Sequence, residues 1–202
     1  MLQLVLACAG DDCVPTNAGP YGTDTSNVLV ERVHCECGTN GGVPIVGSGE
    51  HTVSNVVYRD MVINQTGQGI GFKISEAYEN VTGQAVNITW ENIHILHPRR
   101  AAIYVNVFAE DAAESACVLP KNPNRAHWLT AQNFTYRDIV AVTDTYAGCF
   151  LCSPTRPCSG LHFYNVSVQA PSGFRCFNVH GTAESSSPVP CFVGDAVEVG
   201  QL

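Results

Sequence analysis

The chain has 202 residues, 45% of them hydrophobic and only 14% charged, which is enough apolar material for one buried core. Lysines and arginines number 10 against 18 aspartates and glutamates, and the formal net charge of -8 argues against a nucleic-acid binder, which needs a basic face. No apolar run approaches the ~18 residues of a membrane span, so we expect no membrane partner either.

Cysteine content and glycosylation motifs indicate a secreted protein. Ten cysteines are typical of an oxidising compartment, where they pair as disulfides. Acceptor motifs for N-linked sugars begin at Asn64, Asn80, Asn87, Asn133 and Asn165. Zinc sites are the alternative use of these side chains: Cys35 with Cys37, Cys149 and Cys152 with Cys158, and His94 with His97. Secretion favours disulfides, so we expect no metal and no cofactor.

The chain begins with MLQLVLACAG, which has no basic region and too short an apolar stretch for a signal peptide. It fits instead as part of a repeat, with LQLVLACA in a first series of segments and GDDCVPTN in a second. A stack of coils that starts here exposes an unpaired edge, which solenoids normally cap. We therefore expect residues 1–17 to form an incomplete first coil in the C-terminal part of a longer, N-terminally truncated domain.

A nine-residue pattern then recurs along the chain, with apolar residues at its second, fourth and seventh positions. Most copies open with Asn, and a polar pair follows the fourth position. Because Val, Ile, Thr and aromatic residues dominate, each copy predicts two short strands joined by a polar corner. The copies are NVLVERVHC from Asn27, NVVYRDMVI from Asn55, NITWENIHI from Asn87, NFTYRDIVA from Asn133 and GLHFYNVSV from Gly160.

A second series follows the first at a nearly constant offset of 13 to 15 residues. Constant spacing inside a unit with variable spacing between units is typical of stacked coils with loops on one side. We expect an all-β, right-handed parallel β-helix spanning residues 1–202 as one domain, with a tail at 192–202. The second-series strands should share one sheet, and the Asn positions should stack as ladders. These strands are GVPIVGS from Gly42, GIGFKIS from Gly69, AAIYVNV from Ala101, AGCFLCS from Ala147 and GFRCFNV from Gly173.

The segment GDDCVPTNAG, followed by NVLVERVHCECGTNGGVPIVGSG, resembles the polygalacturonases of glycoside hydrolase family 28. GIGFKIS matches the place of the family's Arg-Ile-Lys motif, and the last coils resemble the cysteine-closed end of plant-type members. The resemblance runs from Gly10 to Phe192. It implies a pectin-lyase-like solenoid, an extracellular or cell-wall location, and hydrolysis of α-1,4-galacturonan, the polysaccharide of pectin.

The resemblance also implies roles for individual residues. Asp11 and Asp12 stand in the family's Asp-Asp motif, where the first is the general acid and the second helps to activate water. Lys73 takes the place of the lysine that holds the substrate carboxylate. Asn40 or Gly41 stands where the motif histidine belongs, and these two positions complete the expected substrate-binding set.

Part of the family's catalytic set is replaced in this chain. Gly71 stands where the motif arginine belongs, and a third carboxylate would lie about one coil before Asp11, beyond Met1. Inverting glycosidases need an acid at the leaving oxygen and a base at the attacking water, with carboxyl groups ~6.5–9.5 Å apart. We therefore expect an incomplete site, with the two aspartates, residues 40–42 and Lys73 lining one groove.

Three disulfide expectations also come from the resemblance. They are Cys13 with Cys35 or Cys37, Cys152 with Cys158, and Cys176 with Cys191.

Two functions of different classes remain open from the sequence. The first is a polygalacturonase-type hydrolase, favoured by the aspartate pair and Lys73. The second is a non-catalytic β-helix that binds acidic polysaccharide or serves as a wall component, favoured by Asn40 and Gly71. Pectate lyase chemistry is a distant third, because the calcium-ligating carboxylates and the arginine base that it needs are not evident.

Overall fold

The structure is a computed structural model, which describes residues 4–7, 10–18, 23–46, 50–74, 82–108, 117–119 and 129–192. Every regular element in these ranges is a β-strand, so the all-β prediction is confirmed. No helix long and apolar enough to cross a membrane occurs among the described residues.

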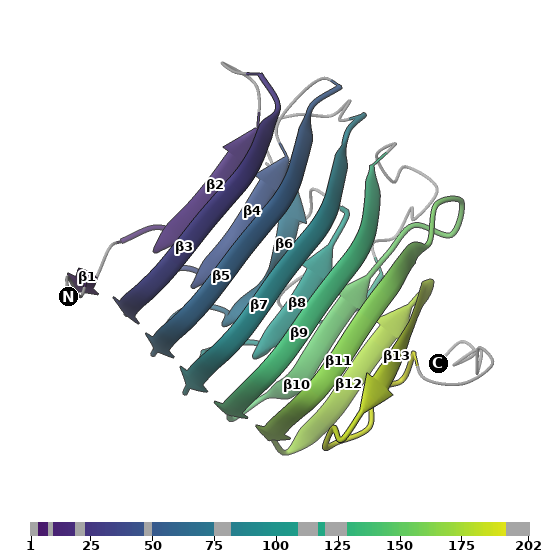
Figure 1. Ribbon diagram of the computed structural model, residues 1–202. Helices are drawn as coiled ribbons and strands as arrows, with labels where there is room; N and C mark the ends of the chain where they lie inside the picture. Colours follow the sequence, from purple (N-terminus) through teal and green to yellow (C-terminus); the bar gives the residue numbers. More distant parts are fainter. Residues whose placement is uncertain are drawn as a thin grey trace.

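The strands form two parallel sheets (Figure 1). The long-strand sheet has the order β1-β3-β5-β7-β9-β11-β13. Its members are β1 (Leu4–Ala7), β3 (Thr25–Glu36), β5 (Thr52–Asn64), β7 (Gln84–Leu96), β9 (Thr130–Val142), β11 (Cys158–Gln169) and β13 (Val179–Glu184). The short-strand sheet has the order β2-β4-β6-β8-β10-β12. Its members are β2 (Val14–Ala18), β4 (Gly42–Val46), β6 (Ile70–Ile74), β8 (Ile103–Asn106), β10 (Tyr146–Leu151) and β12 (Ser172–Phe177).

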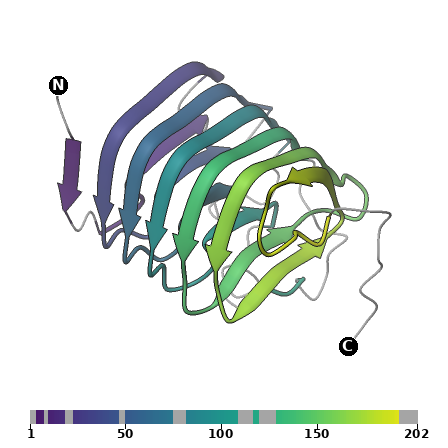
Figure 2. The ribbon, with the colours of Figure 1, turned by 60° about the horizontal axis from the view of Figure 1, so that its bottom comes forward.

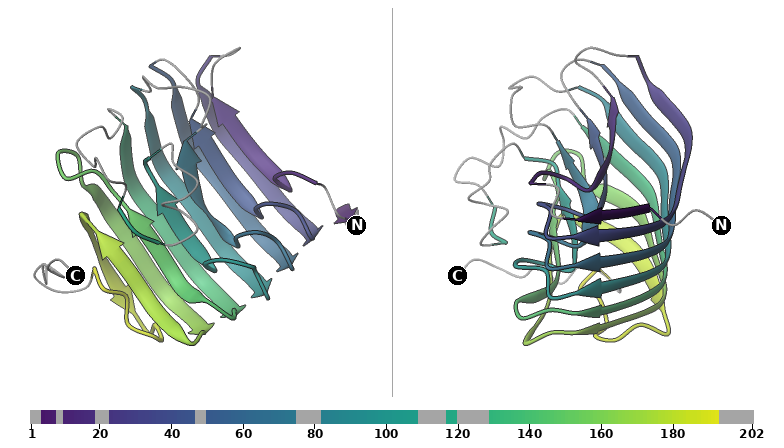
Figure 3. Two further views of the ribbon diagram at one scale, coloured as in Figure 1. Left: turned by 180° about the vertical axis from the view of Figure 1, so that it is seen from behind. Right: turned by 90° about the vertical axis from the view of Figure 1, so that its left-hand side faces the viewer.

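The chain alternates between the two sheets, and every pairing between neighbouring strands is parallel. One long and one short strand therefore make up each coil, and the coils stack as Figures 2 and 3 show. This is a parallel β-helix, as predicted, and the second-series strands share one sheet as expected. The predictions for Asn80 and for the tail beyond Phe192 concern residues outside the described ranges.

Each long strand bends twice where the nine-residue pattern has its first and sixth positions. In β3 these positions are Asn27 and Arg32, both with φ of 58°. Pairing with β5 runs through Glu31↔Arg59, skips Arg32 and resumes at Val33↔Met61. Asn and Asp occupy most of these corners because they tolerate the left-handed region better than other non-glycine residues. The predicted polar corner is confirmed, and the resulting curvature of the long strands is visible in Figure 2.

Asparagine side chains at the first corner form a ladder through four coils. Asn55 Nδ2 donates to Asn27 Oδ1 at 3.3 Å, Asn87 to Asn55 at 3.2 Å, and Asn133 to Asn87 at 3.3 Å. The ladder ends at Gly160, where an added Cβ would lie 2.5 Å from Asn133 Oδ1. The predicted ladder is confirmed, and the missing side chain of Gly160 leaves room for the last amide.

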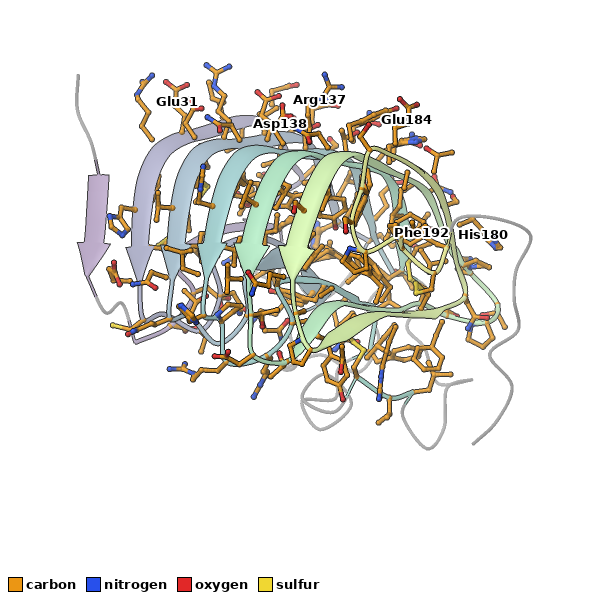
Figure 4. All side chains as sticks on the ribbon, turned by 90° about the horizontal axis from the view of Figure 1, so that it is seen from below. Glu31, Arg137, Asp138, His180, Glu184 and Phe192 are labelled. Carbon is orange, nitrogen blue, oxygen red and sulfur yellow. A yellow bond between two sulfur atoms is a disulfide. The ribbon has the colours of Figure 1, made fainter. Side chains whose placement is uncertain are left out.

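Aromatic side chains fill the space between the sheets. The ring of Trp90 stacks on Tyr58 with 6.0 Å between centroids and on Tyr136 with 4.7 Å, and all three side chains are fully buried. They occupy the fourth position of the pattern on successive coils, with Phe163 next in register. Phe163 in turn contacts Phe192 at 5.1 Å, and the latter covers the core at the C-terminal end (Figure 4). Such pairs add ~0.5–1.5 kcal/mol each beyond their burial.

Charged side chains occupy the outer face of the long-strand sheet beside the second corner (Figure 4). Glu31, Arg59, Glu91 and Arg137 stand in register, so charges of opposite sign alternate from coil to coil. Arg59 donates to Glu31 Oε2 through both Nε, at 2.8 Å, and Nη2, at 2.6 Å. These pairs favour the observed strand register, because a slip of one strand by one residue would separate the opposite charges.

Four disulfides lie in the described part of the chain. Cys13–Cys35, Cys152–Cys158 and Cys176–Cys191 are three pairings that the sequence led us to expect, with the first resolved in favour of Cys35. Cys117–Cys149 was not anticipated. The alternative in which Cys149, Cys152 and Cys158 bind zinc is therefore wrong.

Candidate active site

The two turns that precede β2 and β4 lie side by side on consecutive coils. Cys13 N donates to Asn40 O at 2.8 Å, and Thr39 N donates to Asp11 O at 3.1 Å. The Cys13–Cys35 disulfide ties the first of these turns to the long-strand sheet. Backbone pairing and a covalent bond thus hold the aspartate pair against the turn that follows it in the stack.

Asp12 is surrounded by hydrogen-bond donors from the next two coils. Its Oδ1 accepts from Asn40 Nδ2 and, at 2.9 Å, from Thr39 Oγ1. Its Oδ2 lies 3.2 Å from Lys73 Nζ. The Asp12 side chain is only 6% exposed and that of Lys73 is 20% exposed, so water screens this ion pair little. Both carboxylate oxygens of Asp12 are therefore engaged by side chains of neighbouring coils.

Thr39 joins the two aspartates through a single hydroxyl. Its Oγ1 lies 3.1 Å from Asp11 Oδ1 as well as 2.9 Å from Asp12 Oδ1. One hydroxyl carries one hydrogen, so it cannot donate fully to both carboxylates at once. The residue was not singled out from the sequence, because a Thr in a Gly-Thr-Asn-Gly turn has no distinguishing signal until the facing coil is known.

Asp11 differs from its neighbour in exposure. It is classed among exposed residues, whereas Asp12 is partly buried. Asp11 Oδ1 accepts from the Asp12 backbone N at 2.8 Å as well as from Thr39. Of the pair, Asp11 therefore presents the carboxylate that solvent and a ligand can reach.

Gly41 and Gly71, which the resemblance places at or beside two motif positions, have no room for a side chain. At Gly41 an added Cβ would lie 2.3 Å from Ile63 Cδ1, so this position faces the core and Asn40 is the one that faces Asp12. At Gly71 an added Cβ would lie 1.9 Å from Tyr104 O. The arginine expected there from the resemblance is not merely substituted but sterically excluded.

Gly42 also faces inward, because its added Cβ would lie 2.8 Å from the Tyr58 ring. Of the segment 40–42, Asn40 alone contributes a side chain to the cluster. The structure thus brings Asp11, Asp12, Asn40 and Lys73 together, adds Thr39, and turns Gly41 away.

Tyr58 lies beneath this cluster with its hydroxyl hydrogen-bonded to Thr16 Oγ1 at 2.6 Å. Burial raises the pKa of Tyr58 well above its usual value, and the negative charge of Asp12 raises it further, while the Thr16 hydrogen bond acts in the opposite direction. The phenol therefore stays neutral and serves as packing beneath the carboxylates, not as a base.

The fold and the cluster together define a class: a parallel β-helix with two adjacent carboxyl groups and a lysine on neighbouring coils. A comparison with protein families identifies the family within this class: the model described as "Glycosyl hydrolases family 28" matches residues 4–188. The chain belongs to this family.

Curated relatives agree with that assignment. A polygalacturonase of Chamaecyparis obtusa is 29% identical over 81% of this chain and 30% of its own length. A polygalacturonase of Juniperus ashei is 26% identical over 89% of this chain and 34% of its own length. An exopolygalacturonase of Cochliobolus carbonum is 23% identical over 91% of this chain and 43% of its own length. The chain thus spans well under half the length of these relatives, and no solved structure matches it significantly.

Proposed function

We propose that this protein is a polygalacturonase-type glycoside hydrolase that acts on α-1,4-galacturonan by an inverting general acid/base mechanism. Asp11 is the general acid, and Asp12 is the fixed anion on the side of the attacking water. One observation carries the proposal: Thr39 Oγ1 lies within hydrogen-bond distance of both carboxylates, while Lys73 forms an ion pair with Asp12.

The exposures of the two aspartates match these roles. A general acid must reach the glycosidic oxygen, and Asp11 is the exposed member of the pair. An anion that orients water needs a defined position, and Asp12 has three donors that fix it.

The same geometry supports an incomplete catalytic set. Because both Oδ1 atoms contact one Thr39 hydroxyl, at 3.1 and 2.9 Å, they lie closer together than the ~6.5–9.5 Å that inverting enzymes keep between acid and base. Gly41 and Gly71 supply no histidine or arginine. We therefore expect slow turnover, since positioning and charge stabilisation account for much of a glycosidase's rate.

The direct test is release of reducing ends from polygalacturonate. Wild-type protein should show slow release that Asp11→Asn abolishes, because the amide cannot protonate the leaving oxygen. Asp144→Asn is the matched control: its carboxylate is 84% exposed and lies 3.6 Å from His97, on a turn before β10. A rate that Asp144→Asn lowers as much as Asp11→Asn does would refute the role of Asp11.

A second candidate is a non-catalytic β-helix that binds acidic polysaccharide. The steric exclusion of an arginine at Gly71 favours it, because a bidentate partner for a uronate carboxylate is then lost. Binding of galacturonan with no turnover in either wild type or Asp11→Asn would establish this alternative.

We also propose that the protein is extracellular, in the cell wall or its surroundings. The four disulfides in the described part of the chain support this location, because such bonds persist in oxidising compartments. Reduction by dithiothreitol should therefore lower its thermal stability markedly.

A further inference from the structure

Lys73 is the cation of the site, yet its charge is already used inside the protein. Its Nζ lies 3.2 Å from Asp12 Oδ2, and both side chains are largely shielded from solvent. A ligand carboxylate that approaches Lys73 therefore meets an ammonium group with a counter-ion in place. The ligand carboxylate must therefore compete with Asp12 for the Lys73 ammonium group.

When a ligand carboxylate binds Lys73, Asp12 is the group that loses its contact with the ammonium. An ammonium group has three donors, so a second carboxylate can reach Lys73 from the open side. It would then stand close to Asp12, and two carboxylates sharing one ammonium repel each other. Asp12 has alternative donors in Thr39 and Asn40, which remain on Oδ1 when Oδ2 loses its contact.

We propose that Lys73 is exchanged between Asp12 in the free protein and a uronate carboxylate in the complex. Binding of an acidic sugar unit thereby releases Asp12 Oδ2 from its ion pair and makes it available to a water molecule. A neutral, esterified sugar unit does not trigger this release. The identity of the ligand rests on the proposed function, whereas the exchange rests on the Lys73–Asp12 contact.

The exchange predicts that removing a carboxylate strengthens the binding of an acid. Asp12→Asn frees Lys73 and should raise the affinity for trigalacturonate about tenfold, measured by titration calorimetry. Asp144→Asn is the matched control: it removes an 84% exposed carboxylate that pairs with His97 on the turn before β10, and affinity should change less than about threefold. Lys73→Met should abolish the gain when combined with Asp12→Asn. The trimethyl ester should bind wild type and Asp12→Asn equally.

Equal affinity of wild type and Asp12→Asn for trigalacturonate would overturn the exchange, and so would an equal gain from Asp144→Asn. Absence of binding in all variants would overturn it as well. The hydrolase proposal is judged separately by reducing-end release. Turnover without an increase in the affinity of Asp12→Asn would contradict only the Lys73 exchange. An increase in affinity without turnover would contradict only the hydrolase proposal.

A second measurement needs no variant and so does not depend on the folding of Asp12→Asn. A crystal structure of the wild-type protein with trigalacturonate should show Lys73 Nζ within hydrogen-bond distance of a ligand carboxylate and beyond salt-bridge distance from Asp12 Oδ2. A complex in which the Lys73–Asp12 pair stays closed would contradict the exchange.

Discussion

The Asp12 carboxylate takes all of its side-chain donors from coils other than its own. Thr39 and Asn40 come from the next coil and Lys73 from the one after. A site built from several coils depends on how the coils stack. Neighbouring strands lie ~4.8 Å apart, so a displacement of that size would break the hydrogen bonds between their side chains. This dependence explains why the turns before β2 and β4 are joined by backbone hydrogen bonds.

Two buried tyrosines near the core axis make a matched pair for a stability test. The Tyr58 hydroxyl donates to Thr16, whereas the buried Tyr136 hydroxyl has no hydrogen-bond partner among the residues that the structure describes. Tyr58→Phe should lower the free energy of unfolding by about 1 kcal/mol, because Thr16 loses its donor. Tyr136→Phe should leave it unchanged or raise it by up to about 1 kcal/mol, because an unsatisfied polar group is removed. Urea unfolding of both variants checks this, and a loss in Tyr136→Phe equal to that in Tyr58→Phe would contradict it.

The same tyrosines predict how stability depends on alkaline pH. Burial raises the pKa of both Tyr58 and Tyr136 in the folded protein. Above about pH 10 the unfolded chain loses these protons while the folded protein keeps them, so stability falls as pH rises past that value. Tyr136→Phe should lose less stability than wild type between pH 9 and about 11. Thermal unfolding across this range tests the sign, and a steeper loss in Tyr136→Phe would be the opposite of the expected result.

Sequence reasoning reached some residues of the site but not others. Asp11, Asp12 and Lys73 were identified because they sit in family motifs, and Asn40 because a histidine belongs nearby. Thr39 was missed, since its role exists only once the first two coils face each other. The choice between Asn40 and Gly41 could not be made, because it depends on which side chain points into the core.

At the scale of the element, the corner asparagines combine two functions. Each of the four ladder asparagines adopts a left-handed backbone that most residues avoid, and each is hydrogen-bonded to the asparagine of a neighbouring coil. The nine-residue pattern is visible in the sequence because both requirements recur in every coil. The continuity of each long strand through its corners was not foreseen, since the ladder pairing resumes after each skipped residue.

The two functions of Asn87 can be separated by a pair of substitutions. Asn87→Gly keeps the left-handed conformation, where φ is 58°, and loses only the side-chain hydrogen bonds to its ladder neighbours. Asn87→Ala loses these and adds about 1–2 kcal/mol of backbone strain. We expect Asn87→Ala to be the less stable of the two by that amount in urea unfolding. Equal stability of the two variants would mean that the corner is not strained.

The disulfides mark a limit of sequence reasoning at this scale. Cys152–Cys158 and Cys176–Cys191 lie close in sequence, with separations of 6 and 15, and match the family's pattern. The Cys117–Cys149 bond joins a residue from a connection between coils to β10. Connections vary in length from coil to coil, so no repeat position pointed to Cys117.

At the scale of the whole molecule, the coils are regular except at the turns that carry the aspartate pair. The coils repeat the same sheets, corners and aromatic column, and the first described turns depart from this by presenting two adjacent carboxylates. The net charge of -8 repels a polyanion such as galacturonan at long range, whereas Lys73 offers a short-range attraction. If the proposed function is right, binding of galacturonan depends on contact at the cluster and not on electrostatic steering.

The central claim is that the Asp11–Asp12 cluster is a working but weakened polygalacturonase site. Its most direct test is the rate of reducing-end release from polygalacturonate per molecule, beside a full-length relative such as the Chamaecyparis obtusa polygalacturonase. The claim predicts a rate above that of Asp11→Asn. It also predicts a rate at least about a thousandfold below that of the relative, because Asn40 or Gly41 and Gly71 stand where the resemblance places a histidine and an arginine. A rate within tenfold of the relative, or one no higher than that of Asp11→Asn, would contradict it.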